Sequence, residues 1–283
     1  MSYSATVRGG VTGCGSITTA VHFPTAVSLR GATVVSVADP VVDAREAARR
    51  IAVGARAVSF VPQLLDSGGV HAVVLAMPSS MHAPTAIAAF AAGCHVPVEK
   101  PVATTGAGER ALLEGRPRAP RLGIVGFNFR QHPLRQQARA QMQGGAIGAV
   151  VTLQANSSSR STTHSAGKQP SRSGALFNNG APHVDIAACL FRVFPGSVTA
   201  RALVRESCAR SRVVRADAAP SSRRALGLFV DAVRGWPTAS ATWPTLADGV
   251  RCLAVWLAAA MAAGQGTPVA VRSIGYGTGD GDA

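Results

Sequence analysis

The sequence has no apolar run long enough to cross a membrane and no cysteine spacing typical of a metal site. Its longest apolar run, from Leu253 to Ala263, is shorter than the roughly 20 residues that a spanning helix needs, and Arg251 flanks it. The first residues, Met1-Ser2-Tyr3-Ser4, lack the basic-then-apolar layout of a secretory signal. We therefore expect a cytoplasmic protein with no membrane segment and no metal ion. Its five scattered cysteines should be reduced and mostly fill the core; they are Cys14, Cys94, Cys189, Cys208 and Cys252.

The sequence is also poor in lysine, in acidic residues and in aromatics. Only Lys100 and Lys168 are lysines among 28 basic residues, and 14 acidic residues leave a formal net charge of +14. Such a charge would suit a nucleic-acid surface, but the arginines are spread along the chain and do not cluster with aromatics. We therefore expect a compositional bias and no nucleic-acid partner. A weaker interpretation keeps some arginines as contacts for an acidic or phosphorylated substrate.

What the sequence does contain is enough apolar residues, 47% of 283, for two domains with buried cores. The first 130 residues alternate strand-like and helix-like patterns, which predicts a doubly wound α/β domain of the Rossmann type. Asp43 is a candidate N-terminal cap for one of its helices. The expected strands are 7–11, 33–38, 70–76, 95–98 and 121–126, and the expected helices are 16–29, 43–53 and 83–92.

Beyond residue 130 the pattern changes and predicts a second, smaller α+β domain over 131–274. The stretch 157–173 is polar and predicts an exposed loop, 208–224 has no clear assignment, and the tail 275–283 should be disordered. The expected helices are 133–144, 183–191, 225–234 and 247–263, and the expected strands are 149–155, 198–204 and 269–272.

A glycine-rich turn follows the first predicted strand, in the order Gly13-Cys14-Gly15-Ser16-Ile17-Thr18. This order fits a dinucleotide-binding fingerprint, in which one glycine permits the tight turn and the next lets the backbone approach a pyrophosphate. The phosphates would then lie on the free N–H groups at the N-terminus of the helix. Thr18 replaces the third glycine, so helix packing must accommodate a larger residue. The alternative is an ordinary glycine-rich turn of any α/β protein.

The second predicted strand ends at Asp39, where such domains carry the acidic residue that binds the adenosine ribose hydroxyls. A carboxylate there repels a 2′-phosphate, so NAD is favoured and NADP stays an alternative because Arg45 is near. Asp39 could instead be an ordinary cap of a turn or helix.

Three further motifs follow: Met77-Pro78-Ser79-Ser80-Met81-His82, then Glu99-Lys100-Pro101, then Gly126-Phe127-Asn128-Phe129-Arg130. Together with the glycine turn and His22, they resemble the Gfo/Idh/MocA family of oxidoreductases (relatives of glucose-fructose oxidoreductase and inositol dehydrogenase). The resemblance implies a second domain with an open, mostly antiparallel sheet that carries the substrate site and often the contact between subunits. It implies cofactor contacts at Pro78, Ser79, His82, Glu99, Lys100 and Asn128, beside those of the glycine turn and Asp39.

The resemblance also places Lys100 beside the nicotinamide and the substrate. An ammonium there can stabilise a forming alkoxide, or pass a proton once burial lowers its pKa. The alternative role of Lys100 is a salt bridge with a neighbouring carboxylate.

The family carries an Asp and a His four residues apart in its second domain, and this chain departs from that pattern. Aligned on Leu176, Gly180 and Asp185, the family Asp falls on Asn178 and the family His on Pro182. A shift of one residue instead pairs Asn179 with His183. We take His183 as the candidate base, with a surface or helix-start histidine as the alternative, and Asn178 as a further catalytic candidate that could orient a hydroxyl but not accept a proton.

These observations support two hypotheses. The first is an NAD(P)-dependent dehydrogenase or ketoreductase acting on a secondary alcohol or ketone of a sugar, cyclitol or related polyol. The second is a cofactor-binding protein of the same fold with degraded or no catalysis, such as a regulatory or partner subunit. The second domain looks shortened, so assembly into a homo-oligomer is open.

Overall fold

The structure of the protein, a computed structural model, describes residues 6–66, 68–115, 121–148, 174–191, 195–199, 219–235 and 243–271, without the side chains of 174–179 and 219–220. The predicted strand 149–155, the loop 157–173 and the tail 275–283 lie outside these residues.

A six-stranded parallel sheet forms the centre of the N-terminal part, with strand order β3-β2-β1-β4-β5-β6. This order comes from two halves wound in opposite directions from the middle strands, as in a Rossmann fold. The predicted doubly wound domain is therefore confirmed. The strands are β1 Val7–Thr12, β2 Ala32–Ala38, β3 Arg56–Val58, β4 Ala72–Leu75, β5 Val96–Val98 and β6 Gly123–Val125.

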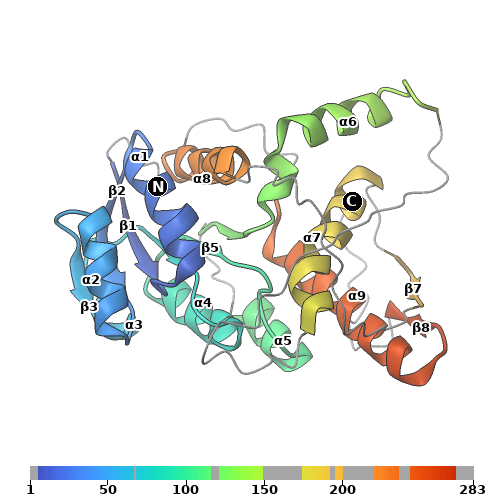
Figure 1. Cartoon of the computed structure of the whole chain (residues 1–283), viewed down its shortest axis with the longest axis horizontal. Helices are drawn as coiled ribbons and strands as arrows, with labels where there is room; N and C mark the ends of the chain where they lie inside the picture. The colour runs from blue at the N-terminus through green and yellow to red at the C-terminus, as the bar shows by residue number, and fades with distance from the viewer. Residues whose placement is uncertain are drawn as a thin grey trace, which may run out of the picture.

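Helices cover both faces of this sheet (Figure 1). The predicted helices are present, while β3, α3 and α5 had not been predicted from the sequence. Asp43 is not the N-terminal cap of α2: the helix begins one residue earlier and its capping position is Val41. The helical segments are the π-helical turn η1 Thr18–His22, α1 Phe23–Ser28, α2 Val42–Ile51, α3 Val61–Leu65, the 3₁₀ turn η2 Ser79–Met81, α4 His82–Ala91 and α5 Gly106–Glu114.

Gly10 within β1 allows a close approach of helix α3. A β-carbon at Gly10 would lie 2.7 Å from Cδ2 of Leu64, and Leu64 is fully buried. The pairing of β1 with β2 also shifts register between Gly9 and Gly10. Glycine in a strand often marks such an irregularity or a close contact, so this pair belongs to the strand despite its low β propensity.

After β6 the chain is mostly helical within the described residues. Helix α7 begins nine residues before the predicted 183 and contains Pro182, and α8 extends into the stretch that had no assignment. Of the predicted strand 198–204, the described residues show only β7. The small antiparallel sheet of β7 and β8 confirms the α+β character of this part. The segments are the 3₁₀ turn η3 Asn128–Gln131, α6 Pro133–Gln143, α7 Gly174–Phe191, β7 Ser197–Val198, α8 Ala219–Val233, α9 Leu246–Gln265 and β8 Val269–Ala270.

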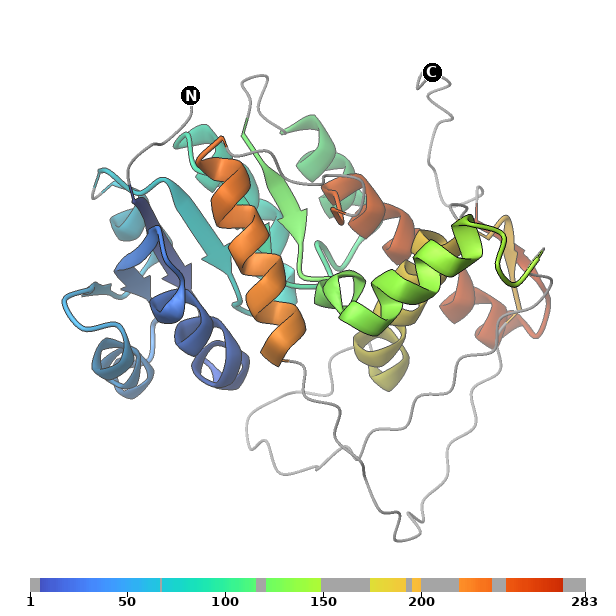
Figure 2. The same ribbon diagram turned by 90° about the horizontal axis from the view of Figure 1, so that it is seen from above.

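Helix α8 returns from late in the sequence to cover the N-terminal sheet. Figures 1 and 2 both show it beside α1, and in Figure 2 it lies over the sheet roughly along the direction of the strands. Its buried Phe229, Val230 and Val233 form one apolar cluster with Val7 of β1 and Ala72 of β4. This face of the sheet is therefore covered by residues that lie more than two hundred positions after its first strand in the sequence.

Helix α9 is long and apolar enough to cross a membrane by length and composition alone, with a mean hydropathy of 1.5. However, 61% of its most apolar 18-residue window is buried inside the protein, and Leu253 and Trp256 belong to the same apolar cluster as β5. It therefore packs as a core helix, and the sequence had suggested a shorter run.

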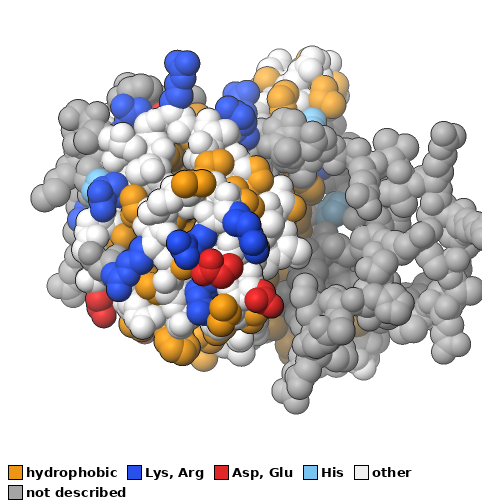
Figure 3. All heavy atoms as spheres, turned by 60° about the vertical axis from the view of Figure 1, so that its left-hand side comes forward, with side chains coloured by type: hydrophobic (Ala, Val, Ile, Leu, Met, Phe, Trp, Pro, Cys, Tyr) orange, Lys and Arg blue, Asp and Glu red, His pale blue; other side chains and the backbone are white. Residues whose placement is uncertain are grey.

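The surface over the Rossmann part carries basic side chains singly, separated by apolar and uncharged atoms, with a few acidic groups among them (Figure 3). A nucleic-acid surface requires clustered positive charge. That the protein has no nucleic-acid partner stays a prediction.

Candidate functional site

The glycine turn lies between the carboxyl ends of β1 and β4. Gly13 has a φ of 79°, and a β-carbon there would lie 2.6 Å from the backbone nitrogen of Met77. Only glycine fits both demands without strain. Gly15 differs, because a β-carbon there would meet nothing within 4 Å. Gly13 thus shapes the turn, whereas Gly15 leaves open space in front of it.

Thr18, which replaces the third glycine of the fingerprint, is buried and takes part in the turn. Its hydroxyl donates a hydrogen bond of 2.5 Å to the carbonyl of Gly13. Thr19 donates in the same way to the carbonyl of Gly15 at 3.0 Å. The helix accommodates a larger residue at this position because the added hydroxyl satisfies a carbonyl of the turn.

Asp39 follows β2 and faces the glycine turn. Its Oδ2 accepts a hydrogen bond of 2.7 Å from the backbone N–H of Cys14, and its Oδ1 accepts one of 2.8 Å from the N–H of Val41. The nearby Arg45 donates from Nη1 to the carbonyls of Asp39 at 2.6 Å and Pro40 at 3.0 Å. Arg45 therefore binds backbone carbonyls of this loop.

His82 lies beneath the loop that follows β4, with only 1% of its surface exposed. Its Nδ1 is 2.6 Å from the carbonyl oxygen of Pro101, and its Nε2 is 2.9 Å from that of Met77. It therefore joins the loop that carries Pro78 and Ser79 to the loop that follows Lys100. This placement suits a residue that positions both loops from behind.

Glu99 and His22 form a polar pair beside the ends of β5 and β6. His22 Nε2 lies 3.0 Å from Glu99 Oε1, and the N–H of Lys100 donates to Oε2 at 3.3 Å. Burial alone would raise the pKa of Glu99, but the hydrogen bond and charge of His22 lower it below the usual range. Burial also lowers the pKa of the Lys100 ammonium, which Glu99 partly opposes. Glu99 is therefore held as a carboxylate next to a lysine that gives up its proton more readily than usual.

A largely apolar pocket opens beside this pair, between α1, α8 and the ends of β4 to β6. Asn128 lies on its rim and donates from Nδ2 to the hydroxyl of Ser222 at 2.5 Å. The absence of a side chain at Gly126 leaves room for Glu99, whose Oε1 lies 3.0 Å from where a β-carbon would be. The lining residues are His22, Thr25, Val74, Pro97, Val98, Glu99, Ile124, Val125, Gly126, Phe127, Asn128, Gln131, Ser222, Ala225, Leu226, Trp243 and Pro244.

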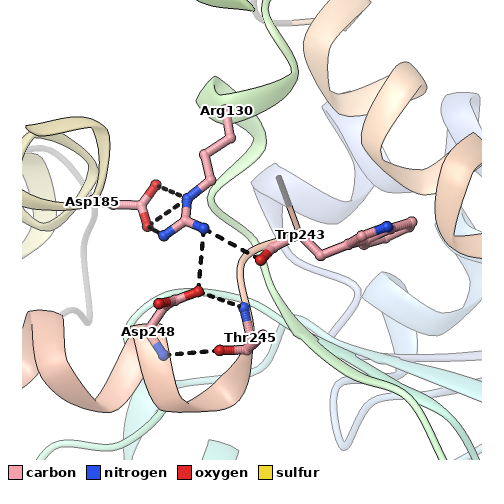
Figure 4. Close-up of polar contacts among 5 residues, drawn as sticks. All are labelled: Arg130, Asp185, Trp243, Thr245 and Asp248. Carbon is pink, nitrogen blue, oxygen red and sulfur yellow. Dashed lines mark hydrogen bonds and ion pairs between the residues drawn. The ribbon is translucent and has the colours of Figure 1, made fainter. Parts of the chain in front are cut away.

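Arg130 ties helix α7, which carries His183, to the Rossmann part (Figure 4). Its Nε lies 2.9 Å from both carboxylate oxygens of Asp185, and its Nη2 lies 2.5 Å from Oδ1. Its Nη1 donates to Asp248 of α9 at 3.2 Å and to the carbonyl of Trp243 at 3.3 Å. The guanidinium thus joins η3, α7 and the start of α9.

The buried charges of this cluster support one another. Burial raises the pKa of Asp185 to about 6, although the bonds from Arg130 act to lower it. Burial acts to lower the pKa of Arg130, but the bonds and charge of Asp185 raise it above its usual value. At neutral pH both partners are therefore charged.

The structure thus brings the predicted residues of the glycine turn, Asp39, Glu99, Lys100 and Asn128 to the carboxyl ends of the sheet. His183 lies half-buried on α7, two residues before Asp185, and the side chain of Asn178 lies outside the described part. Arg130 belongs to the motif Gly126-Phe127-Asn128-Phe129-Arg130, but no role of its own was predicted for it from the sequence. That motif was the only sign in the sequence that pointed to Arg130. Its role could not be predicted because its partner Asp185 lies 55 residues further along the chain. Among the residues that the structure describes, no three His, Cys, Asp and Glu side chains could hold a metal ion.

With this geometry established, comparison with known proteins identifies the domain. A family described as "oxidoreductase family, NAD-binding Rossmann fold", the Gfo/Idh/MocA family, matches residues 7–127. These residues belong to the Gfo/Idh/MocA family. The family resemblance, the Rossmann fold and NAD as the cofactor class are thereby confirmed, whereas the role of each site residue stays a prediction.

Relatives of this family domain are known as dehydrogenases. Levoglucosan dehydrogenase of Pseudarthrobacter phenanthrenivorans is 34% identical over 110 residues, which cover 39% of this chain and 28% of that protein. Inositol 2-dehydrogenase 2 of Saccharopolyspora erythraea is 32% identical over 209 residues, covering 72% of this chain and 60% of that protein. The chain thus matches less than two thirds of the length of either relative.

A solved structure shares the fold over nearly the whole chain. Myo-inositol dehydrogenase from Lactobacillus casei, in complex with NAD(H) and myo-inositol, is 18% identical, with a TM-score of 0.75. The match covers 96% of this chain and 99% of that chain. Both the Gfo/Idh/MocA domain and the helical part therefore follow an architecture known from a solved structure.

Proposed function

We propose that this protein is an NAD-dependent oxidoreductase that transfers a hydride between the cofactor and a secondary alcohol or ketone of a polyol or sugar. The observation that carries the proposal is the open space in front of Gly15, beside Asp39 and the N-terminus of a helix. A pyrophosphate needs close backbone approach and unpaired N–H groups, and the first turn of a helix supplies such groups.

The described residues fit the cofactor along the whole edge of the sheet. The glycine turn and Ser16-Ile17 would receive the pyrophosphate, and Asp39 would accept bonds from the adenosine ribose. Pro78 and Ser79, at the end of β4, would contact the middle of the cofactor. Glu99, Lys100 and Asn128 would lie at its nicotinamide end. Because His82 is buried, it would act by holding the loops of Pro78 and Lys100 in place.

The bound cofactor would supply the hydride chemistry, and the chain would supply orientation and proton transfer. Lys100 would take the proton of the alcohol, or stabilise the forming alkoxide, because burial lowers its pKa. His183 on α7 is the second candidate for the proton. Arg130 would fix the position of His183 through its bonds to Asp185, two residues further along the helix.

NAD is the preferred cofactor because Asp39 places a carboxylate where NADP carries its 2′-phosphate. The Nη1 of Arg45 is engaged by the carbonyls of Asp39 and Pro40, while its other N–H groups keep NADP as the alternative. The substrate class is inferred from the relatives, which are named for inositol and levoglucosan. An acidic or phosphorylated substrate and a homo-oligomer remain predictions.

Cofactor binding is tested by a matched pair of glycine variants. A β-carbon at Gly15 or at Gly106 meets nothing within 4 Å, so both alanine variants should fold. Only Gly15→Ala places its methyl group where the pyrophosphate must lie, and we expect a loss of NAD affinity of about tenfold or more. Fluorescence titration of wild type and both variants measures it. A wild-type protein that binds neither NAD nor NADP would end the proposal.

Turnover is tested with NAD and a panel that includes myo-inositol, levoglucosan and other polyols, followed by absorbance at the NADH wavelength. A specific observation favours a second candidate, a cofactor-binding protein without turnover: Pro182 and Asn178 occupy the positions aligned with the family His and Asp. Binding of NAD with no turnover of any alcohol or ketone in the panel would support that candidate. Turnover that Lys100→Ala abolishes while NAD still binds would exclude it.

A further inference from the structure

Asp39 makes a contact that its expected role at the ribose does not require. Its Oδ2 accepts a 2.7 Å hydrogen bond from the N–H of Cys14, the middle residue of the glycine turn. Cys14 is buried, with 4% of its surface exposed. A buried N–H left without an acceptor is costly, and a bond to a charged acceptor is among the stronger ones. The carboxylate therefore holds the turn itself.

The carboxylate is anchored on its other side, so it can act as a rigid support. Its Oδ1 accepts from the N–H of Val41 at 2.8 Å, and the N–H of Asp39 donates to the carbonyl of Val58 at 3.2 Å. The N–H of Gly13 donates to the carbonyl of Ala38 at 2.9 Å. These bonds connect the turn to the ends of β2 and β3.

We propose that Asp39 is a positioning residue for the pyrophosphate-binding turn, so that removing its carboxylate weakens NAD and NADP alike and does not switch the cofactor preference. This inference rests on the proposed function. If the carboxylate served the ribose alone, its removal would open space for the 2′-phosphate of NADP and remove the negative charge that repels it. Here the same change also releases the N–H of Cys14 and loosens the groups that face both cofactors.

The surroundings of Asp39 give no replacement for the lost support. Arg45, beside Asp39, donates from Nη1 to the carbonyls of Asp39 and Pro40. Both acceptors are backbone groups that persist in Asp39→Ala, so the substitution does not release Arg45. The loss at the turn therefore falls on both cofactors, because both would place their pyrophosphate there.

The test compares Asp39→Ala with Asp39→Asn and with Asp43→Ala as the matched control. Asp43 is an exposed acid in the first turn of α2, so its variant removes the same charge nearby. Affinities for NAD and for NADP are measured by titration, and melting temperatures check folding. Hydrogen–deuterium exchange without cofactor follows the segment 11–18 directly.

We expect Asp39→Ala to bind both cofactors about 10- to 100-fold more weakly than wild type, the range for a lost hydrogen bond to a charged group. Its segment 11–18 should exchange faster, while Asp43→Ala matches wild type. Asp39→Asn keeps one carbonyl oxygen for the N–H of Cys14 and should bind NAD more tightly than the alanine variant. If the alanine variant does not fold, the asparagine variant carries the same comparison with wild type.

A gain in NADP affinity in Asp39→Ala, with unchanged exchange of segment 11–18, would overturn the inference and leave NAD binding intact. Equal exchange in all three variants would do the same. A wild-type protein that binds neither cofactor is a different outcome, because it removes the proposed function while the exchange comparison still tests the role of Asp39 at the turn.

Discussion

Glu109 shows how one buried residue can set the response of this protein to pH. It lies in α5 with no exposed surface, and neither carboxyl oxygen has a hydrogen-bond partner in the described structure. Burial raises its pKa to about 8, and the charge of Arg110 opposes this only in part. The carboxyl group is therefore protonated in the folded protein at neutral pH.

A pKa raised by folding stabilises the folded state at low pH, and this contribution is lost as pH rises through the folded value. From a usual 4.5 to about 8, the free energy of unfolding should fall by about 1.4 kcal/mol per pH unit. We expect Glu109→Gln to lack this slope. Urea unfolding of both proteins at pH 5.5 and pH 8 measures the difference.

Glu46→Gln serves as the control for Glu109, because Glu46 is exposed and pairs only with Arg49 on the surface of α2. Its pH dependence should equal that of wild type, since exposed pairs contribute little. Parallel curves for wild type and Glu109→Gln would contradict the prediction.

Lys100 gives a prediction about activity at the residue scale. Because burial lowers its pKa, the amine loses its proton at a lower pH than an ordinary lysine does. If it accepts the proton of the alcohol, kcat for oxidation rises with pH through that lowered value. We expect Lys100→Met to lose this rise and about 100-fold or more in kcat. The pH profiles of kcat for both proteins, with NAD affinity as the control, decide it; an unchanged profile in the variant would assign the proton to another group.

Residue types with a backbone requirement could be predicted from the sequence, and contacts between distant segments could not. Gly13 and Asp39 were predicted because a tight turn and a strand end demand such residues locally. His82 instead owes its position to carbonyls of two separate loops, and Arg130 owes its role to Asp185 on α7. Asp43 was wrong as a cap because α2 already begins at Val42, which places Asp43 inside its first turn.

At the scale of elements, the contact between η3, α7 and α9 depends on Arg130. The guanidinium is buried, with 7% exposed, and it bonds two carboxylates and a carbonyl. Removing one partner of a buried pair leaves an uncompensated charge and costs about 3–5 kcal/mol. We expect Arg130→Met to destabilise the protein by about this amount and to lower kcat through the displacement of His183. Chemical denaturation and steady-state kinetics measure both effects.

Arg49→Met is the matched control for Arg130→Met, since Arg49 forms an exposed pair and should change stability by less than about 1 kcal/mol. A double variant that also replaces Asp185 by Leu should recover part of the lost stability, because it removes the unpaired carboxylate. Equal losses of unfolding free energy in Arg49→Met and Arg130→Met would show that the buried cluster contributes no more to stability than an exposed ion pair does.

Element boundaries in the helical part were harder to predict than those in the sheet. The strands of the Rossmann part can be predicted from their local β-branched residues. Helix α7 instead contains Pro182 and two glycines, which predict against a helix. Proline costs about 3 kcal/mol inside a helix, and here packing against α9 offsets it. The short elements β3 and α3 were missed because five residues or fewer carry too little periodicity.

At the scale of the whole molecule, the sheet and the C-terminal helices share one core. One apolar cluster contains Val98 of β5 and Phe90 of α4 together with Leu253 and Trp256 of α9. The N–H of Val125 in β6 donates to the carbonyl of Pro244 at 2.9 Å, just before α9. The described residues on the two sides of the predicted boundary at residue 130 therefore share a core, and the division into two domains stays a prediction.

This arrangement predicts that the chain unfolds as a single unit. All three tryptophans, at 236, 243 and 256, lie in the C-terminal part of the sequence, and Trp256 packs in the same apolar cluster as β5, so their fluorescence reports on that part and on its contact with the sheet. Far-UV circular dichroism follows the helices of both parts. We expect the two thermal transitions to coincide in wild type. Phe229→Ala truncates a side chain that is 1% exposed between α8 and the sheet, and should lower the free energy of unfolding by about 3–5 kcal/mol. The fluorescence and circular dichroism transitions should then move to lower temperature together.

A fragment of residues 1–131 completes this test, because it keeps every strand of the sheet but lacks the cover from α8 and α9. Its exposed apolar face, which includes Val7, Ala72 and Ile124, should prevent cooperative unfolding and favour aggregation. A fragment that unfolds cooperatively and binds NAD would contradict the prediction, as would separate transitions in the full chain. Either result would make the Rossmann part an independent domain, so that the C-terminal helices would matter to the site through His183 of α7 and Ser222 of α8, and not through the folding of the sheet.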